Sequence, residues 1–507
     1  MTLLSRVLGF IRDVVLARLF GAGAGMDVFV VAFQIPNFLR RLFAEGAFAP
    51  AFVPVLTQVR KVGDAEDEQA FIDRVAGTLG GILIAVTALG VLGAPVLIFV
   101  FSSGFGGGEA AERFDLAVDM LRFTFPYILF ISLTALAGAV LNVHERFAVP
   151  AFTPVLLNLV LISAAVFLST GMARPEMGLA VGVLVAGAVQ LAFQLPFLRA
   201  IGRLPRPRWG WRDCNVQRVL TLMFPAIFGS SVAQLNLLVD RHIASYLETG
   251  SISWLYYSDR LLEFPLGLFA VALATVILPR LSARYDREAP QAFSATLDWA
   301  LRLTALIAVP AAIGLTVLAV PLIATLFQYR EFDAHDTVMA GAALTAYGLC
   351  LLGFVLVKVL APGYFSRQDT RTPVRIGIIA MGVNIALNGV FVLAFLRLRF
   401  DAPHAGLAAA TGVSAFVNAG LLYRGLRREG VYAPSAQWVT LLPRLLAAAA
   451  LMGVLVWWLA GPRETWLIGS AWDRAGHLAL CVLGGAASYV AALWLFGLRP
   501  RHLRTPA

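Results

Sequence analysis

Long runs of apolar residues recur along almost the whole chain, and they limit its possible folds more than any other feature. Apolar residues make up 59% of the 507 residues and charged residues only 14%. Soluble globular proteins average about 45–50% and about 25%, respectively. A helix needs about 20 consecutive apolar residues to cross a bilayer. The composition therefore excludes a soluble enzyme and indicates an integral membrane protein.

The apolar runs are separated by glycine, proline and charged residues, and they predict fourteen membrane-spanning helices. The fold class we expect is an all-α integral membrane protein. The connections are too short for a soluble catalytic or receptor domain, and the first run is interpreted as a helix of the mature protein rather than a signal peptide. The predicted spans are 2–21, 27–60, 75–102, 116–142, 150–170, 178–200, 219–247, 253–284, 293–328, 336–360, 373–396, 404–427, 438–460 and 474–498.

Arginine and lysine are unevenly distributed between the two sets of predicted loops. An even number of spans places both termini on one side of the membrane. If that side is the cytoplasm, its loops and tail carry 23 arginines and lysines, and the opposite loops carry 7. Cytoplasmic loops are the ones enriched in these residues, so both termini are predicted to be cytoplasmic. The net charge of +10 is then a topology signal at the anionic inner leaflet, and it does not require a nucleic-acid partner.

A weak internal repeat divides the chain. We predict two parallel-related six-helix lobes at 1–200 and 219–427, joined by a cytoplasmic linker at 201–218 and followed by two C-terminal helices and a tail at 428–507. A shift of 225 residues aligns a glycine hairpin and the long helix after it without gaps. The identical pairs are Gly25 and Gly250, Ala47 and Ala272, Ala49 and Ala274, Pro54 and Pro279, and Leu56 and Leu281.

Several charged residues fall inside the predicted spans. An arginine at the centre of a lone span costs about 2.5–3.5 kcal/mol to insert, so such charges require a water-filled or protein-lined environment. They occur in the first, second, seventh and eighth spans: Arg6, Arg12, Asp13 and Arg18; Asp27, Arg40, Arg41 and Glu45; Asp240 and Arg241; and Asp259, Arg260 and Glu263.

Depth and helical spacing divide these charges into candidate ligands and candidate ion pairs. Arg6 and Arg18 lie near the ends of the first span, where a long side chain can reach the interface, whereas Arg12 and Asp13 lie at mid-depth.

In the second span, the i,i+4 spacing allows Arg41 and Glu45 to form an ion pair, while Arg40 points about 100° away from Arg41. Glu263 lies three residues after Arg260, so the two can form an ion pair. This pair is either structural or a gate that opens when an anion competes with Glu263 for Arg260.

Arginine presents a fork of donors that matches phosphate and carboxylate, and it stays charged at physiological pH. Several arginines at one depth suit a large anionic headgroup better than a metal ion or a cationic drug. Two interpretations stay open for Arg12, Arg40 and Arg260. They are either substrate-binding cations of a cavity or members of buried structural pairs.

A second polar group spans three helices. Asn384 and Asn388 are spaced i,i+4, Thr411 lies in the next span, and Asp240 lies in the seventh. One carboxylate with neutral oxygens suits a hard cation of the size of sodium. The alternative is ordinary hydrogen bonding between helices, with Asp240 paired to Arg241.

Nothing in the sequence supports catalysis. It contains no nucleophile elbow, no HExxH, no phosphate loop and no zinc-ligand spacing. The cysteines Cys214, Cys350 and Cys481 are far apart and predict neither a disulfide framework nor a metal site. We therefore expect a protein that is not an enzyme, with no catalytic residues.

Five stretches of the sequence are distinctive: SRVLGFIRDVVLARLFGAG (5–23), PNFLRRLFAEGAFAPAFVPVL (36–56), TFPYILFISLTALAGAVLN (124–142), WLYYSDRLLEFPLGLFAVALATVILP (254–279) and KVLAPGYFSRQDTRTPV (358–374). Together they resemble the MurJ (MviN) family of lipid II flippases within the multidrug/oligosaccharidyl-lipid/polysaccharide exporter superfamily, and the similarity extends over nearly the whole chain. The resemblance implies a fourteen-helix fold with two six-helix lobes, a cationic cavity and a C-terminal helix pair that forms a lipid groove.

The resemblance also implies residue roles. The essential positions of the family match Arg6, Arg12, Asp27, Arg40 and Arg260, with Glu263 beside the last, so Arg6 joins the expected substrate-binding residues. The remaining charges, Asp13, Arg41, Glu45 and Asp259, are expected to act in gating or ion pairs together with Asp27 and Glu263. A sodium ion in the second lobe would be held by Asp240, Asn384, Asn388 and Thr411.

The function we expect is transport of lipid II from the inner to the outer leaflet of the bacterial cytoplasmic membrane by alternating access, with peptidoglycan polymerases as candidate partners. The alternative on the same fold is an ion-coupled exporter of a drug or of another polyprenyl-linked oligosaccharide. Two further alternatives are a membrane glycosyltransferase, which would need carboxylates at an interfacial loop, and a scaffold of the division machinery, for which the buried arginines would be dispensable.

Overall fold

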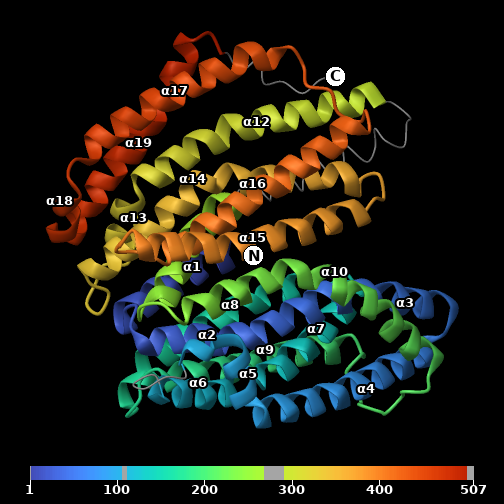
Figure 1. Ribbon diagram of the computed structural model, residues 1–507. Coiled ribbons are helices and arrows are strands. Elements are labelled where there is room, and N and C mark those ends of the chain that lie inside the picture. Colours follow the sequence, from blue (N-terminus) through green and yellow to red (C-terminus); the bar gives the residue numbers. More distant parts are fainter. Residues whose placement is uncertain (1, 106–110, 268–289, 499–507) are drawn as a thin grey trace. The chain divides into compact units, whose positions relative to one another are not determined.

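The structure is a computed structural model and describes residues 2–105, 111–267 and 290–498. Within these ranges it describes the side chains except those at 2–3, 44–45, 225–226, 228–234 and 290. All regular elements in the described residues are helices (Figure 1). The chain forms two compact units, unit 1 at Met1–Ser253 and unit 2 at Trp254–Ala507.

The described residues contain 11 helices that are long and apolar enough to cross a membrane. Each of these helices overlaps one of eleven predicted spans; the largest difference over both ends is at the third, predicted at 75–102, where the long helix is Ala65–Leu92 and a short one follows at Ala94–Ser102. The other three predicted spans, the first, seventh and eighth, are helical as well, at Thr2–Phe20, Cys214–Ala244 and 251–267, respectively. The described part of the eighth span ends at residue 267. The expectation of an all-helical, multi-span membrane protein is therefore confirmed.

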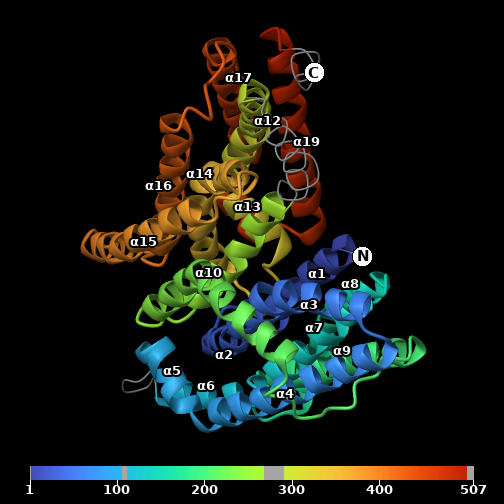
Figure 2. The same cartoon turned by 90° about the vertical axis from the view of Figure 1, so that its right-hand side faces the viewer.

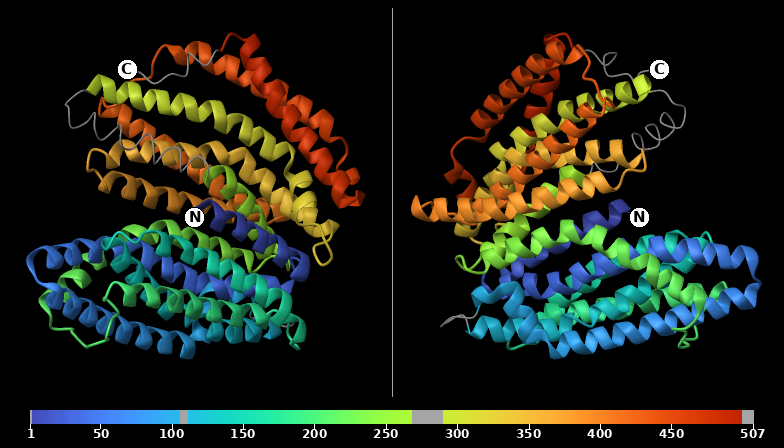
Figure 3. Two further views of the ribbon diagram at one scale, coloured as in Figure 1. Left: turned by 180° about the vertical axis from the view of Figure 1, so that it is seen from behind. Right: turned by 45° about the vertical axis from the view of Figure 1, so that its right-hand side comes forward.

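Unit 1 is a bundle of helices that follow one another closely in the sequence. Figures 2 and 3 show α4 along one edge of this bundle. The helices are α1 (Thr2–Phe20), α2 (Ala24–Arg40), α3 (Ala49–Val62), α4 (Ala65–Leu92), α5 (Ala94–Ser102), α6 (Ala111–Thr124), α7 (Tyr127–Val143), α8 (Ala148–Ser163), α9 (Met177–Ala200) and α10 (Cys214–Ala244), with short helices η1 (Arg41–Phe48), η2 (Ser103–Phe105), η4 (Ala164–Leu168) and η5 (Ser169–Gly171).

The second predicted span is interrupted by a π-helical stretch. The chain runs from α2 through η1 into α3, and η1 is a π-helix. A π-helix is rare, and it occurs most often as a single turn at a functional site. Arg40 is the last residue of α2 and Arg41 the first of η1, so the two arginines lie where the helical geometry changes. The sequence did not predict this change.

The core of unit 1 lies where η1, α3, α4, α7 and α10 meet. Its largest side chains include Phe48, Phe52 and Phe71, whose rings stack at centroid distances of 5.0 and 5.7 Å. The helix α10 packs against η1, α3 and α5, and therefore belongs to this unit. The lobe boundaries predicted from the repeat stay a prediction.

In unit 2, α14 lies against both α12 and α16, and the last two long helices, α17 and α19, pack against each other (Figure 1). The pair is joined to α12 and α13 through an apolar cluster that includes Trp466 and Tyr489. The helices are α12 (Pro290–Val317), α13 (Ala319–Leu326), α14 (Ala334–Phe365), α15 (Arg371–Arg397), α16 (Ala405–Arg428), α17 (Gln437–Ala460), α18 (Arg463–Ile468) and α19 (Ala471–Leu495).

Candidate functional site

The charges of α1 divide into buried and exposed ones. Arg12 and Asp13 are 7% and 2% exposed, whereas Arg6 and Arg18 are exposed. Arg12 Nη2 lies 2.7 Å from Asp13 Oδ1, and its Nη1 donates to Asn158 Oδ1 of α8 at 3.0 Å. The guanidinium of Arg12 is therefore neutralised by Asp13 and oriented by an amide of a neighbouring helix.

Asn158 was not among the residues predicted from the sequence. Its Nδ2 donates to the carbonyl of Ser5 at 3.1 Å and to that of Pro154 at 3.2 Å, so the amide is fixed while its oxygen accepts from Arg12. Asn158 is 5% exposed and stands in the apolar run of the fifth predicted span. An amide in such a run is a signal that could have identified it.

Asp27 accepts three hydrogen bonds from one short segment. The amides of Gly250 and Ser253 donate to its carboxylate at 2.7 and 2.8 Å, and the Ser253 hydroxyl donates at 2.6 Å. Gly250 has a φ of 100°, in the range that favours glycine, and a helix begins at 251. The carboxylate therefore satisfies amides at a helix start, where donors lack partners within the helix and negative charge is stabilised.

The arginines at the α2–η1 junction are partly buried. Arg40 Nε donates to Asn37 Oδ1, one helical turn earlier, at 2.9 Å. The predicted pairing of Arg41 with Glu45 stays a prediction, because the side chain of Glu45 lies outside the described ones. A part of the Arg40 guanidinium is thus oriented by α2 itself.

In unit 2, Arg260 and Glu263 form the ion pair that their spacing predicted. Arg260 Nη1 lies 2.8 Å from Glu263 Oε2, and the Arg260 guanidinium lies over the Tyr256 ring at 4.8 Å from its centroid. The side chains of Arg260 and Glu263 are 25% and 48% exposed, and Asp259 is partly buried. An exposed ion pair contributes little to stability, so an anion can displace Glu263 at a small cost.

Three of the four predicted sodium ligands lie together in unit 2. Asn384 Nδ2 donates to Thr411 Oγ1 at 3.1 Å, and Asn388 Nδ2 donates to Asn384 Oδ1 at 3.2 Å. Both asparagines are fully buried in α15. The fourth residue, Asp240, belongs to unit 1, where it is 8% exposed, and the neighbouring Arg241 Nη1 donates to the carbonyl of Ile252 at 2.8 Å.

An apolar groove lies between α12, α17 and α19 in unit 2. Its volume is about 670 Å³, and its walls include Leu306 and Gly314 of α12, Val456 of α17, and Gly485 and Tyr489 of α19. The Tyr489 hydroxyl donates to the carbonyl of Leu306 at 2.7 Å, so it is satisfied. Such a groove suits an alkyl or polyprenyl chain, because its surface is almost entirely hydrocarbon.

A buried carboxylate fixes one wall of this groove. The i,i+4 spacing of Asp298 and Arg302 in the sequence predicts an ion pair between them on one helix, and Arg302 Nε lies 3.0 Å from Asp298 Oδ2. It did not predict that Asp298 also accepts hydrogen bonds from the side chains of Tyr432, Ser435 and Trp438, at 2.9, 2.8 and 2.7 Å. These donors lie in the α16–α17 connection and in α17 itself, so Asp298 joins α17 to α12.

The Tyr432 hydroxyl remains a donor in this network. Burial, followed by the nearby charge of Asp298, raises the pKa of the phenol. Tyr432 therefore stays protonated at any physiological pH and keeps its bond to the carboxylate.

The multi-span helical fold, the arginines within its helices and the apolar groove of unit 2 are typical of a membrane transporter for an amphipathic anion. A solved structure titled "Inward-facing conformation of a multidrug resistance MATE family transporter of the MOP superfamily" has the same fold, with a TM-score of 0.69, 14% identity, and coverage of 85% of this chain and 96% of that chain.

The chain belongs to the lipid II flippase MurJ family, whose model matches residues 16–474. The chain is 50% identical to the probable lipid II flippase MurJ of Vibrio cholerae, over 99% of this chain and 96% of that protein. It is 43% identical to the lipid II flippase MurJ of Burkholderia cenocepacia, over 100% and 97%. A solved structure of the lipid II flippase MurJ, described as inward closed, covers 98% of this chain and 97% of that chain at 27% identity and a TM-score of 0.80.

Proposed function

We propose that this protein is a lipid II flippase, a transporter and not an enzyme, which moves the undecaprenyl-diphosphate-linked peptidoglycan precursor from the inner to the outer leaflet. The observation that carries the proposal is the match over the full chain to lipid II flippases, at up to 50% identity among the relatives compared. The arginines and the apolar groove support it, because the substrate has an anionic head and a hydrocarbon tail.

In this proposal the two ends of the substrate bind different surfaces. Arg6, Arg12, Arg40 and Arg260 bind the diphosphate and the peptide carboxylates, since arginine forms paired hydrogen bonds with both groups. The polyprenyl tail lies in the apolar groove of unit 2. Arg260 exchanges its ion pair with Glu263 for an interaction with the substrate, and the ion pair forms again after the substrate leaves.

The proposed setting is the cytoplasmic membrane with both termini in the cytoplasm, as the arginine and lysine distribution predicts. Transport there follows alternating access, and the membrane potential, worth about 2.3 kcal/mol per charge per 100 mV, returns the empty cationic carrier. Peptidoglycan polymerases are the proposed consumers of the transported precursor.

The experiment that tests the function replaces the flippase of a bacterium with this chain. The endogenous flippase is depleted, this protein is expressed, and outer-leaflet lipid II is measured. We expect restoration of outer-leaflet lipid II and of growth. Transport of cationic dyes without restoration would instead support the alternative of a drug exporter on the same fold.

A side chain that fills the apolar groove should block transport without unfolding the protein. A Cβ atom at Gly314 would meet no other atom within 4 Å, so Gly314→Phe places a ring in the groove. We expect a reduction of lipid II transport of at least tenfold at an unchanged protein level. Gly382→Phe is the matched control, since Gly382 of α15 also has open space at its Cβ position and does not line the groove. Equal transport by the two variants would contradict the assignment of the tail to the groove.

We also propose that a sodium ion binds in unit 2 at Asn384, Asn388 and Thr411, three of the four residues predicted from the sequence. A ligand that binds only the folded state stabilises it by RT ln(1 + [L]/Kd), or about 2.7 kcal/mol at a hundredfold excess over Kd. We therefore expect sodium chloride to raise the unfolding temperature of the detergent-solubilised protein above its value in choline chloride. Asn384→Ala and Asn388→Ala should each remove the difference. A difference that persists in both variants would contradict the site.

A further inference from the structure

The connection between α9 and α10 is fixed along the surface of α4. The Arg206 amide donates to Asp73 Oδ1 at 2.8 Å, the Arg208 amide to the Asp73 carbonyl at 3.0 Å, and the Gly210 amide to Thr78 Oγ1 at 3.0 Å. These bonds hold the residues between 206 and 210 in place. The connection is thus an ordered part of unit 1 that packs against α4.

Two glycines of α4 allow this close approach. A Cβ atom at Gly77 would lie 2.2 Å from the Arg208 carbonyl oxygen, and one at Gly81 would lie 2.6 Å from the Trp209 ring. Real Cβ atoms do not come so close, so a larger residue at either position would displace the connection. The glycines therefore set where the Trp209 ring rests on α4.

Two tryptophans of the connection stack on each other and remain open to the surroundings. The rings of Trp209 and Trp211 lie 6.3 Å apart with an interplanar angle of 12°, and the residues are 67% and 45% exposed. Tryptophan is enriched where a membrane meets water, because its ring is apolar and its N–H is polar. An exposed stacked pair in a connection that packs against a membrane helix is therefore expected at the membrane boundary.

The sequence of α4 places the pair at that boundary. Arg74 is the last charged residue of α4, and the helix continues to Leu92 without another charge. Further along the helix, Ile84, Leu89 and Leu92 are 59%, 71% and 79% exposed. The surface of α4 therefore changes from charged to lipid-facing at the turn where the two tryptophans lie.

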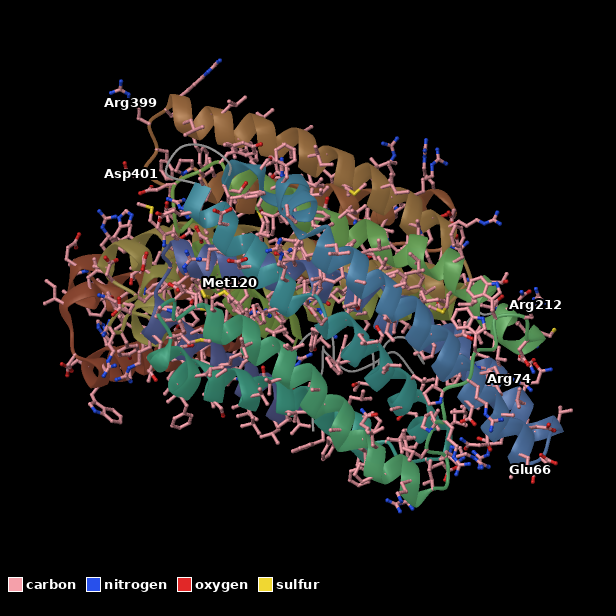
Figure 4. All side chains as sticks on the ribbon, turned by 90° about the horizontal axis from the view of Figure 1, so that it is seen from below. Glu66, Arg74, Met120, Arg212, Arg399 and Asp401 are labelled. Atoms are coloured by element: carbon pink, nitrogen blue, oxygen red, sulfur yellow. The ribbon has the colours of Figure 1, made fainter. Side chains whose placement is uncertain are left out.

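Arginines surround the same concavity, whose volume is about 800 Å³. Arg74 Nη1 lies 2.5 Å from Asp213 Oδ2, while Asp213 Oδ1 accepts from the first amides of α10, those of Asn215 at 2.9 Å and Val216 at 3.1 Å. Both carboxylate oxygens of Asp213 therefore have partners within unit 1. Arg212 is exposed and forms no hydrogen bond or ion pair within the part of the chain that the structure describes. Figure 4 shows Arg74 and Arg212 at the same end of unit 1.

We propose that this concavity binds the headgroup of an anionic phospholipid from the surrounding bilayer. Arg212 and the outward N–H groups of Arg74 bind the phosphate, the tryptophan rings cover the glycerol region, and the acyl chains extend along the exposed apolar side of α4. Basic pockets beside membrane helices are suited to such headgroups. The proposal is independent of the lipid II site, because none of these residues belongs to the arginines or the groove assigned to that substrate.

Native mass spectrometry of the delipidated, full-length protein tests the proposal. The protein is titrated with phosphatidylglycerol and, separately, with phosphatidylcholine of the same acyl chains. We expect wild type to prefer phosphatidylglycerol, and Arg212→Gln combined with Trp211→Ala to weaken its binding about fivefold or more, the size expected when one arginine near an anionic lipid is lost. Arg428→Gln combined with Trp472→Ala is the matched control, since both residues are exposed and lie in unit 2.

Three results would overturn the proposal. These are equal affinity of the test and control variants for phosphatidylglycerol, equal binding of the two phospholipids by wild type, and displacement of phosphatidylglycerol by millimolar inorganic phosphate, which would indicate a site for soluble anions. Arg212→Gln alone is measured as well, because Arg212 is exposed and forms no hydrogen bond or ion pair among the described residues, and this variant should retain part of the effect.

Discussion

Replacing Asp298 with alanine should destabilise unit 2 strongly and reduce lipid II transport. The change removes an acceptor that holds Tyr432, Ser435 and Trp438, and it leaves Arg302 without its carboxylate. Removing one partner of a buried ion pair costs about 3–5 kcal/mol. Because these bonds join α17 to α12, the wall of the apolar groove loses its attachment. The measurements are the unfolding temperature in detergent and outer-leaflet lipid II in depleted cells.

Two further variants separate the hydrogen bonds of Asp298 from its charge. Trp438→Phe removes one bond, made by the indole N–H, and should cost about 1.5–3 kcal/mol, the size of a hydrogen bond to a charged group. Asp298→Asn keeps the shape and part of the accepting capacity, so its stability should fall between those of wild type and Asp298→Ala. If Asp298→Ala unfolds at the wild-type temperature, the carboxylate does not hold α17.

Asp27→Ala should have the second large effect. It leaves the amides of Gly250 and Ser253 and the Ser253 hydroxyl without their acceptor in a buried environment. Each unsatisfied buried donor costs about 1–3 kcal/mol, so a loss of about 3 kcal/mol or more is expected. The same bonds position the start of the helix that carries Arg260, so transport should fall as well. Thermal unfolding and the lipid II assay measure the two effects.

The serine of this contact provides the control. Ser253→Ala removes only the hydroxyl bond and keeps both amide bonds to Asp27, so it should lose about 1.5 kcal/mol, the lower end for a hydrogen bond to a charged group, and retain most of the transport activity. If Ser253→Ala and Asp27→Ala were equally stable, the amides would not depend on the carboxylate, and the proposed contact would be wrong.

The sequence predicted the membrane-spanning helices, which are determined by the need to place apolar residues in the bilayer. Apolar runs set the membrane helices because the bilayer admits only long apolar segments, and eleven such helices lie in the described residues. The i,i+3 and i,i+4 spacings of Arg260 with Glu263 and of Asp298 with Arg302 also predicted two ion pairs that the structure contains. Such pairs follow from local helix geometry alone.

Contacts between distant segments could not be predicted in the same way. Nothing local to Asp27 indicates that it accepts from Gly250 and Ser253, more than 220 positions later. The pairing of Arg12 with Asn158 likewise depends on how α1 packs against α8. The roles of the arginines in substrate binding stay predictions, because they concern a substrate that the sequence indicates only through residue chemistry and family resemblance.

The most direct test of the central claim measures outer-leaflet lipid II in cells that are depleted of their own flippase and express this chain or its variants. We predict that wild type and Arg428→Ala, which changes an exposed arginine at the end of α16, restore outer-leaflet lipid II. The double variant Arg40→Ala with Arg260→Ala, present in the membrane at the same level, should not restore it. Full restoration by the double variant would contradict the account.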